Sequence, residues 1–183
     1  MEIRNHLLVP CTVIASPNQD QRPDESDISL IVMHNISLPP QVYGGSYIAD
    51  LFCNRLDPHA HPYFSTIAEL KVSSHLVIDR LGVITQYVPF NCRAWHAGIS
   101  IFEERERCND FSIGIELEGS DSEAFTEAQY TALFPVIRLL HQQYPKTQQN
   151  KIVGHEHIAS GRKTDPGPYF DWPRLKAEGF LCV

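Results

Sequence analysis

The sequence predicts an α/β fold in which a central mixed β-sheet is flanked by helices. Apolar, β-branched runs that are typical of buried strands alternate along the chain with segments whose apolar residues recur at helical spacing. The chain has 183 residues, which is the length of one domain with a sizeable core. Strands interleaved with helices over such a length favour one sheet with helices on its faces. We therefore expect residues 1–183 to form a single domain.

The first regular elements are expected after an N-terminal segment without regular structure. Residues 1–27 are polar and turn-rich, so we expect them to be irregular. Residues 28–34 (ISLIVMH) form a compact β-branched run that predicts a buried strand. Ser46 then precedes apolar residues at helical spacing over residues 47–52, which predicts a short helix. His34 ends the strand, either facing a crevice, where functional groups collect, or as a simple capping residue.

The middle of the chain predicts a hairpin and then a long strand. Residues 75–88 read as two strands joined by a tight turn at Gly82. Residues 111–119 (FSIGIELEG) alternate cleanly, with apolar side chains on one face and small or acidic ones on the other. Small residues before Glu116 leave room for its carboxylate in a cavity, where it could act as a general base. The same alternation also fits a strand face exposed to solvent.

The last third of the chain predicts two helices and a short strand. Residues 126–129 (TEAQ) match a capping box, and apolar residues continue at helical spacing to His141. Pro135 inside this helix is expected to kink it or to remove one hydrogen bond. Residues 151–153 predict a short strand that leads to His155, and residues 172–176 predict a brief closing helix.

Residues 154–168 gather imidazole, ammonium and carboxylate groups between that strand and a proline-rich turn. Imidazole and carboxylate both bind first-row metals, and three protein ligands with an open fourth position are typical of zinc that activates water. His155 does not begin an H-E-x-x-H helix, because the second histidine is replaced by Ala159. The prolines after Asp165 restrict the backbone and present its side chain. We interpret the stretch as the core of a metal site, although a hydrogen-bonded histidine also fits His155 alone.

The sequence does not decide the roles of two further segments that contain histidine. Residues 91–98 (NCRAWHAG) either line a cleft or surround a buried tryptophan with satisfied neighbours. The histidines within residues 57–62 (DPHAHP) fall between two prolines, which favours a surface turn over a metal site.

Composition restricts the class of function. The formal net charge of −7 argues against binding to a nucleic-acid backbone. No run approaches the roughly 18 apolar residues of a transmembrane helix, and the N-terminus has no signal-like pattern, so we expect a cytoplasmic chain without membrane contact. The five cysteines are scattered and lack any C-x-x-C pair, which indicates free thiols. Cys108 beside Arg107 is a candidate reactive thiol.

Together these residues resemble the zinc-dependent N-acetylmuramoyl-L-alanine amidases, and within them the cytoplasmic AmpD-type branch that recycles cell-wall fragments. The resemblance runs over nearly the whole chain. It is carried by residues 32–35 (VMHN), 57–58 (DP), 93–98 (RAWHAG), 107–119 (RCNDFSIGIELEG) and 162–168 (RKTDPGP).

The resemblance implies hydrolysis of the amide between 1,6-anhydro-N-acetylmuramic acid and the L-alanine of the stem peptide. It implies one Zn²⁺ per chain, held by His34, His155 and Asp165 at one edge of the sheet. Glu116 would take a proton from water, and Lys163 would stabilise the oxyanion. Lys163 is also consistent with a structural ion pair to a carboxylate such as Glu116. The expected partner is a small muropeptide, and the chain is expected to be a monomer.

The substrate-binding residues are less defined by the resemblance. Lys71 stands where the family commonly has an arginine near the peptide carboxylates, and lysine grips a carboxylate as a point charge, not as a planar fork. Ser160 stands where the family commonly has proline. The remaining substrate candidates are Asn35, Tyr63, Trp95 and Arg107.

Two other functions are compatible with the same resemblance. One is a secreted or phage-type amidase that cuts intact peptidoglycan, against which the missing export signal and the free cysteines argue. The other is a non-catalytic peptidoglycan-recognition module, which can dispense with zinc ligands. The full set of ligands, glutamate and lysine in this chain favours an enzyme.

Overall fold

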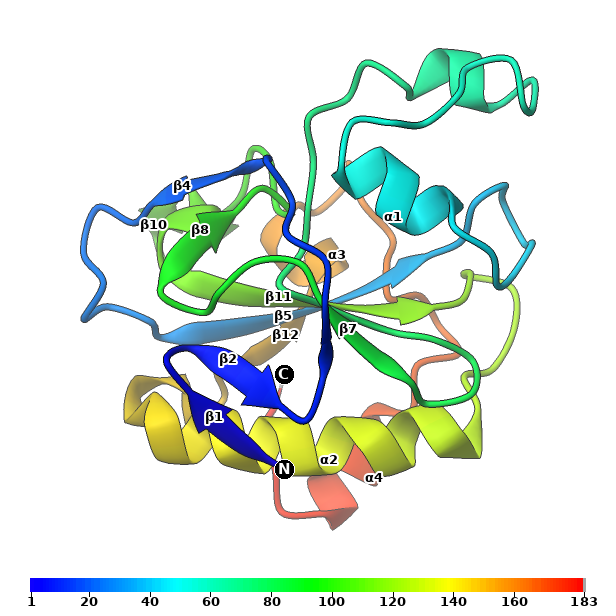
Figure 1. The fold of residues 1–183 in the computed structure, drawn as a ribbon. Helices are drawn as coiled ribbons and strands as arrows, with labels where there is room; N and C mark the ends of the chain where they lie inside the picture. The colour runs from blue at the N-terminus through cyan, green and yellow to red at the C-terminus, as the bar shows by residue number, and fades with distance from the viewer. Residues whose placement is uncertain (183) are drawn as a thin grey trace.

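The structure is a computed structural model that describes residues 1–182, and a six-stranded sheet forms its centre (Figure 1). In spatial order the strands are β12 (Ile152–Gly154), β5 (Leu30–Ile36), β11 (Ser112–Glu118), β6 (Leu76–Ile78), β7 (Ile84–Gln86) and β3 (Thr12–Val13). The pairs from β12 to β6 are parallel, β6 and β7 are antiparallel, and β7 and β3 are parallel. The predicted mixed sheet and the predicted hairpin are therefore confirmed.

Helices cover both faces of the sheet (Figure 1). The long helix α2 (Glu127–Gln143) crosses one face, with α4 (Trp172–Ala177) beside it, whereas α1 (Tyr47–Phe52) and α3 (His155–Ile158) lie on the opposite side. Three short 3₁₀ helices complete the helical elements: η1 (Phe64–Thr66), η2 (Cys108–Asp110) and η3 (Pro145–Thr147). No helix among residues 1–182 combines the length and the apolar composition needed to cross a membrane.

The alternation along β5 and β11 decides which side chains reach the core and which reach the site. Ile31 and Met33 of β5 pack in the main core cluster with Ile113 and Ile115 of β11 and with the apolar face of α2. The intervening residues of β5 belong to a separate cluster on the other face, and His34 continues that second set. The sheet face opposite α2 therefore carries His34 of β5 and the polar residues of β11.

The three predicted helices are present in the structure as α1, α2 and α4. Thr126 Oγ1 accepts a hydrogen bond from the Gln129 amide at 3.2 Å, and Gln129 Oε1 accepts one from the Thr126 amide at 2.9 Å, which confirms the capping box. α2 runs through Pro135 without interruption to Gln143. The missing N–H removes one hydrogen bond at most, and the buried apolar residues on both sides of Pro135 keep the helix packed on the sheet.

The N-terminal segment is more regular than predicted. Within residues 1–27 the structure has β1 (Glu2–Arg4), β2 (Leu7–Val9), β3 and β4 (Gln19–Gln21). β1 pairs with β2, while β4 pairs with β8 (Cys92–Ala94), and a third small sheet joins β9 (Ile101–Phe102) to β10 (Arg105–Glu106). The prediction of an irregular segment was wrong because strands this short show no period, and two of them pair with residues far along the chain.

Candidate metal centre

Two histidines and an aspartate converge at the C-terminal end of two neighbouring strands. His34 lies near the end of β5, and His155 directly follows β12, which pairs with β5 in parallel. His34 Nδ1 lies 3.1 Å from His155 Nδ1 and 2.8 Å from Asp165 Oδ2. His155 Nδ1 lies 3.0 Å from the same carboxylate oxygen. Because adjacent parallel strands end at the same edge, the sheet places both imidazoles together, and the loop after α3 adds the carboxylate.

The hydrogen bond on the far side of His155 shows which of its ring atoms faces the cluster. His155 Nε2 donates to the carbonyl oxygen of Ala97 at 3.0 Å, so Nδ1 of the neutral ring carries a lone pair. That lone pair faces Asp165 Oδ2, and an ionised carboxylate oxygen has no hydrogen to donate. A proton or a metal ion is therefore required between these atoms.

Burial and mutual contact set the charges of the cluster. Burial lowers the pKa of His34 to about 4, so this imidazole is neutral at pH 7. Burial alone would raise the pKa of Asp165, but the contacts with His155 and His34 outweigh burial and hold the pKa below its ordinary value. A neutral imidazole and an ionised carboxylate are the forms that bind metals.

The donor set and its spacing fit zinc. Two imidazole nitrogens and one carboxylate oxygen are a typical three-ligand set for zinc with an open position. Bond lengths of about 2.0–2.1 Å in a tetrahedron separate ligand atoms by about 3.3 Å. The observed separations of 2.8–3.1 Å are close to this value, so small outward shifts of the side chains would admit the ion.

Glu116 and Glu118 lie on the same strand face but have different surroundings. Glu118 accepts hydrogen bonds from the backbone amides of Gly44 at 2.5 Å and Arg80 at 3.2 Å. Glu116 pairs in register with His34, is 8% exposed, and its Oε2 has no hydrogen-bond partner among residues 1–182. Burial, together with the charge of Asp165, raises the pKa of Glu116 well above its ordinary value. Glu118 is therefore held by the fold, whereas the buried Oε2 of Glu116 has no hydrogen bond to the described residues.

A cavity of about 590 Å³ opens over this cluster. Eight of the predicted site residues line it: His34, Asn35, Tyr63, Trp95, Glu116, His155, Lys163 and Asp165. Lys71 and Arg107 are not among the described residues that line this cavity. Leu70 and Val72, on either side of Lys71, do line the cavity, while Arg107 borders a separate hollow of about 700 Å³. The structure thus brings the predicted metal and catalytic residues together, but only part of the predicted substrate set.

The side chains around the cavity differ in how firmly they are held. Lys163 is exposed and makes no ion pair with residues 1–182, so the structural pair with Glu116 is not present. The Asn35 amide donates to Asp121 Oδ1 at 2.6 Å and to the Pro166 carbonyl at 3.1 Å. Asn35 therefore already serves to tie the loop that carries Asp165 to the end of β5.

Sequence reasoning missed several residues around the site. Asp121 receives hydrogen bonds from Asn35 and from Thr164 Oγ1, and Arg162 donates to the carbonyl of Ala97 at 2.8 Å. No local pattern could have identified them, because their partners lie far along the chain. The prediction of a reactive Cys108 was wrong: its side chain is fully buried, and burial raises the pKa of its thiol.

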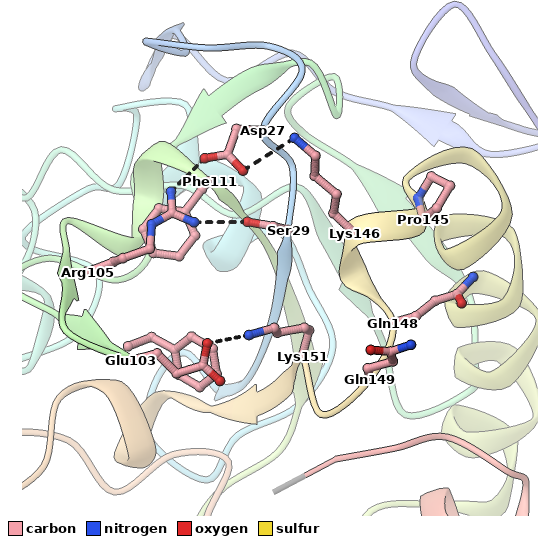
Figure 2. A pocket seen from close by; sticks show the side chains of 11 residues that line it. Asp27, Ser29, Glu103, Arg105, Phe111, Pro145, Lys146, Gln148, Gln149 and Lys151 are labelled. Carbon is pink, nitrogen blue, oxygen red and sulfur yellow. Dashed lines mark hydrogen bonds and ion pairs between the residues drawn. The ribbon is translucent and has the colours of Figure 1, made fainter.

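A second cavity of about 420 Å³ lies at the opposite end of the same strands, where Ser29 and Lys151 precede β5 and β12 (Figure 2). Its lining includes three basic side chains, and each is paired with an acidic one of the same cavity. Arg105 Nη2 lies 2.6 Å from Asp27 Oδ2, Lys146 Nζ lies 3.9 Å from Asp27 Oδ1, and Lys151 pairs with Glu103. Every basic side chain of this cavity is thus ion-paired, with Asp27 shared between Arg105 and Lys146.

Comparison with known proteins decides the family. The family model described as N-acetylmuramoyl-L-alanine amidase matches residues 24–168, a segment that contains the whole metal cluster. The chain belongs to this family. The resemblance inferred from the motifs is therefore confirmed, and this amidase is a hydrolase that acts on an amide bond.

Individual relatives of this amidase agree over nearly the full chain. The 1,6-anhydro-N-acetylmuramyl-L-alanine amidase AmpD of Haemophilus influenzae is 54% identical over 173 residues, which are 94% of each chain. The crystal structure of a Se-Met AmpD derivative is 53% identical, has a TM-score of 0.94, and covers 97% of this chain and 99% of that chain.

A more distant solved structure carries a ligand. It is the complex of the amidase AmiD from E. coli with the substrate anhydro-N-acetylmuramic acid-L-Ala-D-gamma-Glu-L-Lys. That chain is 30% identical, with a TM-score of 0.63, and the match covers 84% of this amidase and 58% of AmiD.

Proposed function

We propose that this amidase uses one Zn²⁺ to hydrolyse the amide between 1,6-anhydro-N-acetylmuramic acid and the L-alanine of the stem peptide. The observation that carries the proposal is the convergence of His34, His155 and Asp165 beside an unpartnered buried glutamate in one cavity. The 54% identity to the 1,6-anhydro-N-acetylmuramyl-L-alanine amidase AmpD of Haemophilus influenzae supports the anhydro-muropeptide as substrate. The AmiD complex supports a small muropeptide as the ligand class.

The metal would be held by His34 Nδ1, His155 Nδ1 and Asp165 Oδ2, the three atoms that face one another. When bound, zinc would polarise the amide carbonyl and lower the pKa of water from 15.7 to about 7. One cluster of this kind occurs among residues 1–182, which supports one ion per chain.

Glu116 would move the proton. Its raised pKa and its unpartnered Oε2 suit a carboxylate that accepts a proton from the attacking water and then delivers it to the departing nitrogen of L-alanine. The amide C–N bond breaks, the water oxygen remains on the lactyl carbonyl carbon, and the amine leaves with the transferred proton. Glu118 is unsuited to this role, because backbone amides already occupy both of its oxygens.

Lys163 would stabilise the negative oxygen that develops on the attacked carbonyl. Its side chain lines the cavity that contains Glu116 and Asp165, and it is exposed and without an ion pair in residues 1–182. A free ammonium group contributes more as charge develops in the transition state than in the ground state, which favours a catalytic role over a structural one.

The remaining predicted residues would contact the substrate beyond the scissile bond. Tyr63 and Trp95 line the cavity and offer aromatic surface, while Lys71 and Arg107 stand outside it and could reach only a peptide that extends past its rim. Asn35 contributes through the loop that it holds. We further propose that the enzyme works as a cytoplasmic monomer without nucleic-acid or membrane partners, which its five free cysteines and net charge of −7 support.

One experiment tests bond, substrate and metal together. Purified protein is incubated with soluble anhydro-muropeptides or with whole sacculi, with and without a chelator, and the products are identified by mass spectrometry. We expect free stem peptide and anhydro-N-acetylmuramic acid from the soluble substrate, and loss of both products with the chelator. Preferential release of peptides from sacculi would favour an enzyme of intact peptidoglycan, and full activity after metal removal would exclude the zinc mechanism.

A further inference from the structure

Two consecutive residues of the chain bind the outer ring nitrogens of both candidate histidine ligands. His34 Nε2 lies 2.9 Å from His96 Nδ1, and His155 Nε2 donates to the carbonyl oxygen of Ala97 at 3.0 Å. His34 and His155 belong to different segments, yet a single dipeptide, residues 96–97, contacts both. The orientation of the two imidazoles therefore depends on one short piece of backbone.

Asn109 fixes that piece of backbone. Its side-chain oxygen accepts hydrogen bonds from the backbone amide of His96 at 3.1 Å and from that of Ala97 at 2.8 Å. Arg162 contributes from the other side, because its guanidinium donates to the Ala97 carbonyl at 2.8 Å. Ala97 is thus held at its backbone amide by Asn109 and at its carbonyl by Arg162.

The ring of His96 is fixed by β11. His96 Nε2 lies 3.1 Å from Ser112 Oγ, and the ring lies directly over Gly114. A Cβ atom at position 114 would stand 2.5 Å from His96 Cγ, a distance that no side chain tolerates. Gly114 is therefore the residue that allows the imidazole to approach the strand.

When a cation is bound to Nδ1 of His34 and of His155, only one placement of the ring hydrogens satisfies all of these hydrogen bonds. A cation on His34 Nδ1 leaves the ring hydrogen on Nε2, which donates to His96 Nδ1, and His96 Nε2 then donates to Ser112 Oγ. On the other ligand, His155 Nε2 donates to Ala97. In both cases the ring hydrogen points away from the cluster, which leaves the Nδ1 lone pairs of His34 and His155 free for the metal.

From this geometry we infer that residues 96–97, anchored by Asn109, form a positioning element that orients both imidazole ligands for the metal. His96 and Asn109 touch neither the metal nor the scissile amide in this scheme, so they act through His34 and His155. The inference rests on the proposed zinc function. Outer partners of metal-binding histidines typically account for a 10–100-fold change in metal affinity, and we expect losses of that size.

The test compares zinc affinity with the stability of metal-free protein in paired variants. His96→Phe keeps a ring but removes the acceptor, whereas His96→Asn keeps an acceptor at the Nδ1 position. Asn109→Leu removes the anchor, and Asn109→Asp retains its oxygen. His59→Phe, in an exposed turn outside the cavity, is the matched control for the first substitution. Zinc dissociation constants are measured by chelator competition, and melting temperatures are measured on the metal-free proteins.

We expect His96→Phe and Asn109→Leu to weaken zinc binding by about 10–100-fold, and His96→Asn and Asn109→Asp to recover most of that loss. His59→Phe should match the unmodified protein. Zinc affinity that is unchanged in His96→Phe and Asn109→Leu would overturn the inference while leaving the zinc function intact. It would also be overturned if affinity simply followed the metal-free melting temperature, with no recovery in the conservative variants. Absence of zinc binding by the unmodified protein would instead refute the proposed function itself.

Discussion

Replacing Glu116 with glutamine separates proton transfer from every other property of the site. Glutamine keeps the shape of the side chain but cannot accept a proton. Because Glu116 Oε2 has no hydrogen-bond partner among residues 1–182, the substitution breaks no bond of the fold. Glu116→Gln should therefore bind zinc normally while kcat falls by about 10²–10⁴-fold, the range for loss of a general base. At 1.36 kcal/mol per tenfold, the barrier rises by about 2.7–5.4 kcal/mol.

The same substitution should not destabilise the metal-free protein at neutral pH. Burial raises the pKa of Glu116 above its unfolded value, so between these two pKa values the folded state binds more protons than the unfolded state. Stability then falls as pH rises from the ordinary glutamate pKa of about 4.3 toward the raised value. Glutamine removes this term, so the melting temperature of Glu116→Gln should equal or exceed that of the unmodified protein at pH 7, and the difference should disappear below about pH 4.

Glu118→Gln is the matched control, and we expect it to lower stability while leaving kcat nearly unchanged. Glu118 accepts from the amides of Gly44 and Arg80, and glutamine offers only one oxygen to these two donors. One partly buried N–H loses its acceptor, which costs about 0.5–1.5 kcal/mol. For a domain of this size, each kcal/mol lowers the melting temperature by about 2–4 °C. Glu118→Gln should therefore melt earlier, while the folded protein keeps near-normal kcat.

The assay measures three properties of both variants: steady-state kinetics on anhydro-muropeptides, zinc content, and melting curves with and without chelator. A normal kcat in zinc-loaded Glu116→Gln, or a loss of 10²-fold or more in folded Glu118→Gln, would show that the wrong carboxylate was assigned.

Three further predictions concern the metal and Lys163. Substituting alanine for His34, His155 or Asp165 should abolish zinc binding. His157→Ala and His61→Ala should retain zinc, because Nδ1 of each of these histidines accepts a hydrogen bond from a nearby backbone amide. The zinc content of the purified variants checks this, and loss of zinc in His157→Ala would reassign the ligand. Lys163→Met should retain zinc and melting temperature while kcat falls by about 10²–10³-fold and KM changes little; a fully active variant would remove Lys163 from the mechanism. Zinc affinity should fall as the pH decreases toward 4, because protons then compete for His34, whose pKa is about 4; chelator competition between pH 4 and 7 measures it, and a constant affinity over this range would contradict the ligand set.

The local pattern of the sequence was sufficient for the main architecture. The β-branched run before His34, the alternation of residues 111–119 and the capping box at Thr126 each fix one element through contacts within a few residues. The same alternation correctly assigned Glu116 to the face opposite the apolar side chains. The motifs together indicated the family, because long runs of functional residue types are read directly from the chain.

Other features depended on contacts between distant segments. The strands of residues 1–27 were missed, since β4 is specified by its pairing with β8 and not by a period of its own. The difference between Glu116 and Glu118 was also invisible, because it arises from the amides of Gly44 and Arg80. Burial of Cys108 likewise cancels the reactivity that its neighbour Arg107 suggested.

The sequence by itself determined which chemical groups are present and on which face of each strand they lie. Only the tertiary structure decided their surroundings: that two imidazoles and a carboxylate meet within 2.8–3.1 Å, and that residues 96–97 hold the outer nitrogens of both rings. The physical reason is the distance along the chain over which each effect acts. Side-chain periodicity is set by backbone geometry over a few residues, whereas ligand geometry and pKa depend on burial and on charges that only the packed chain brings together.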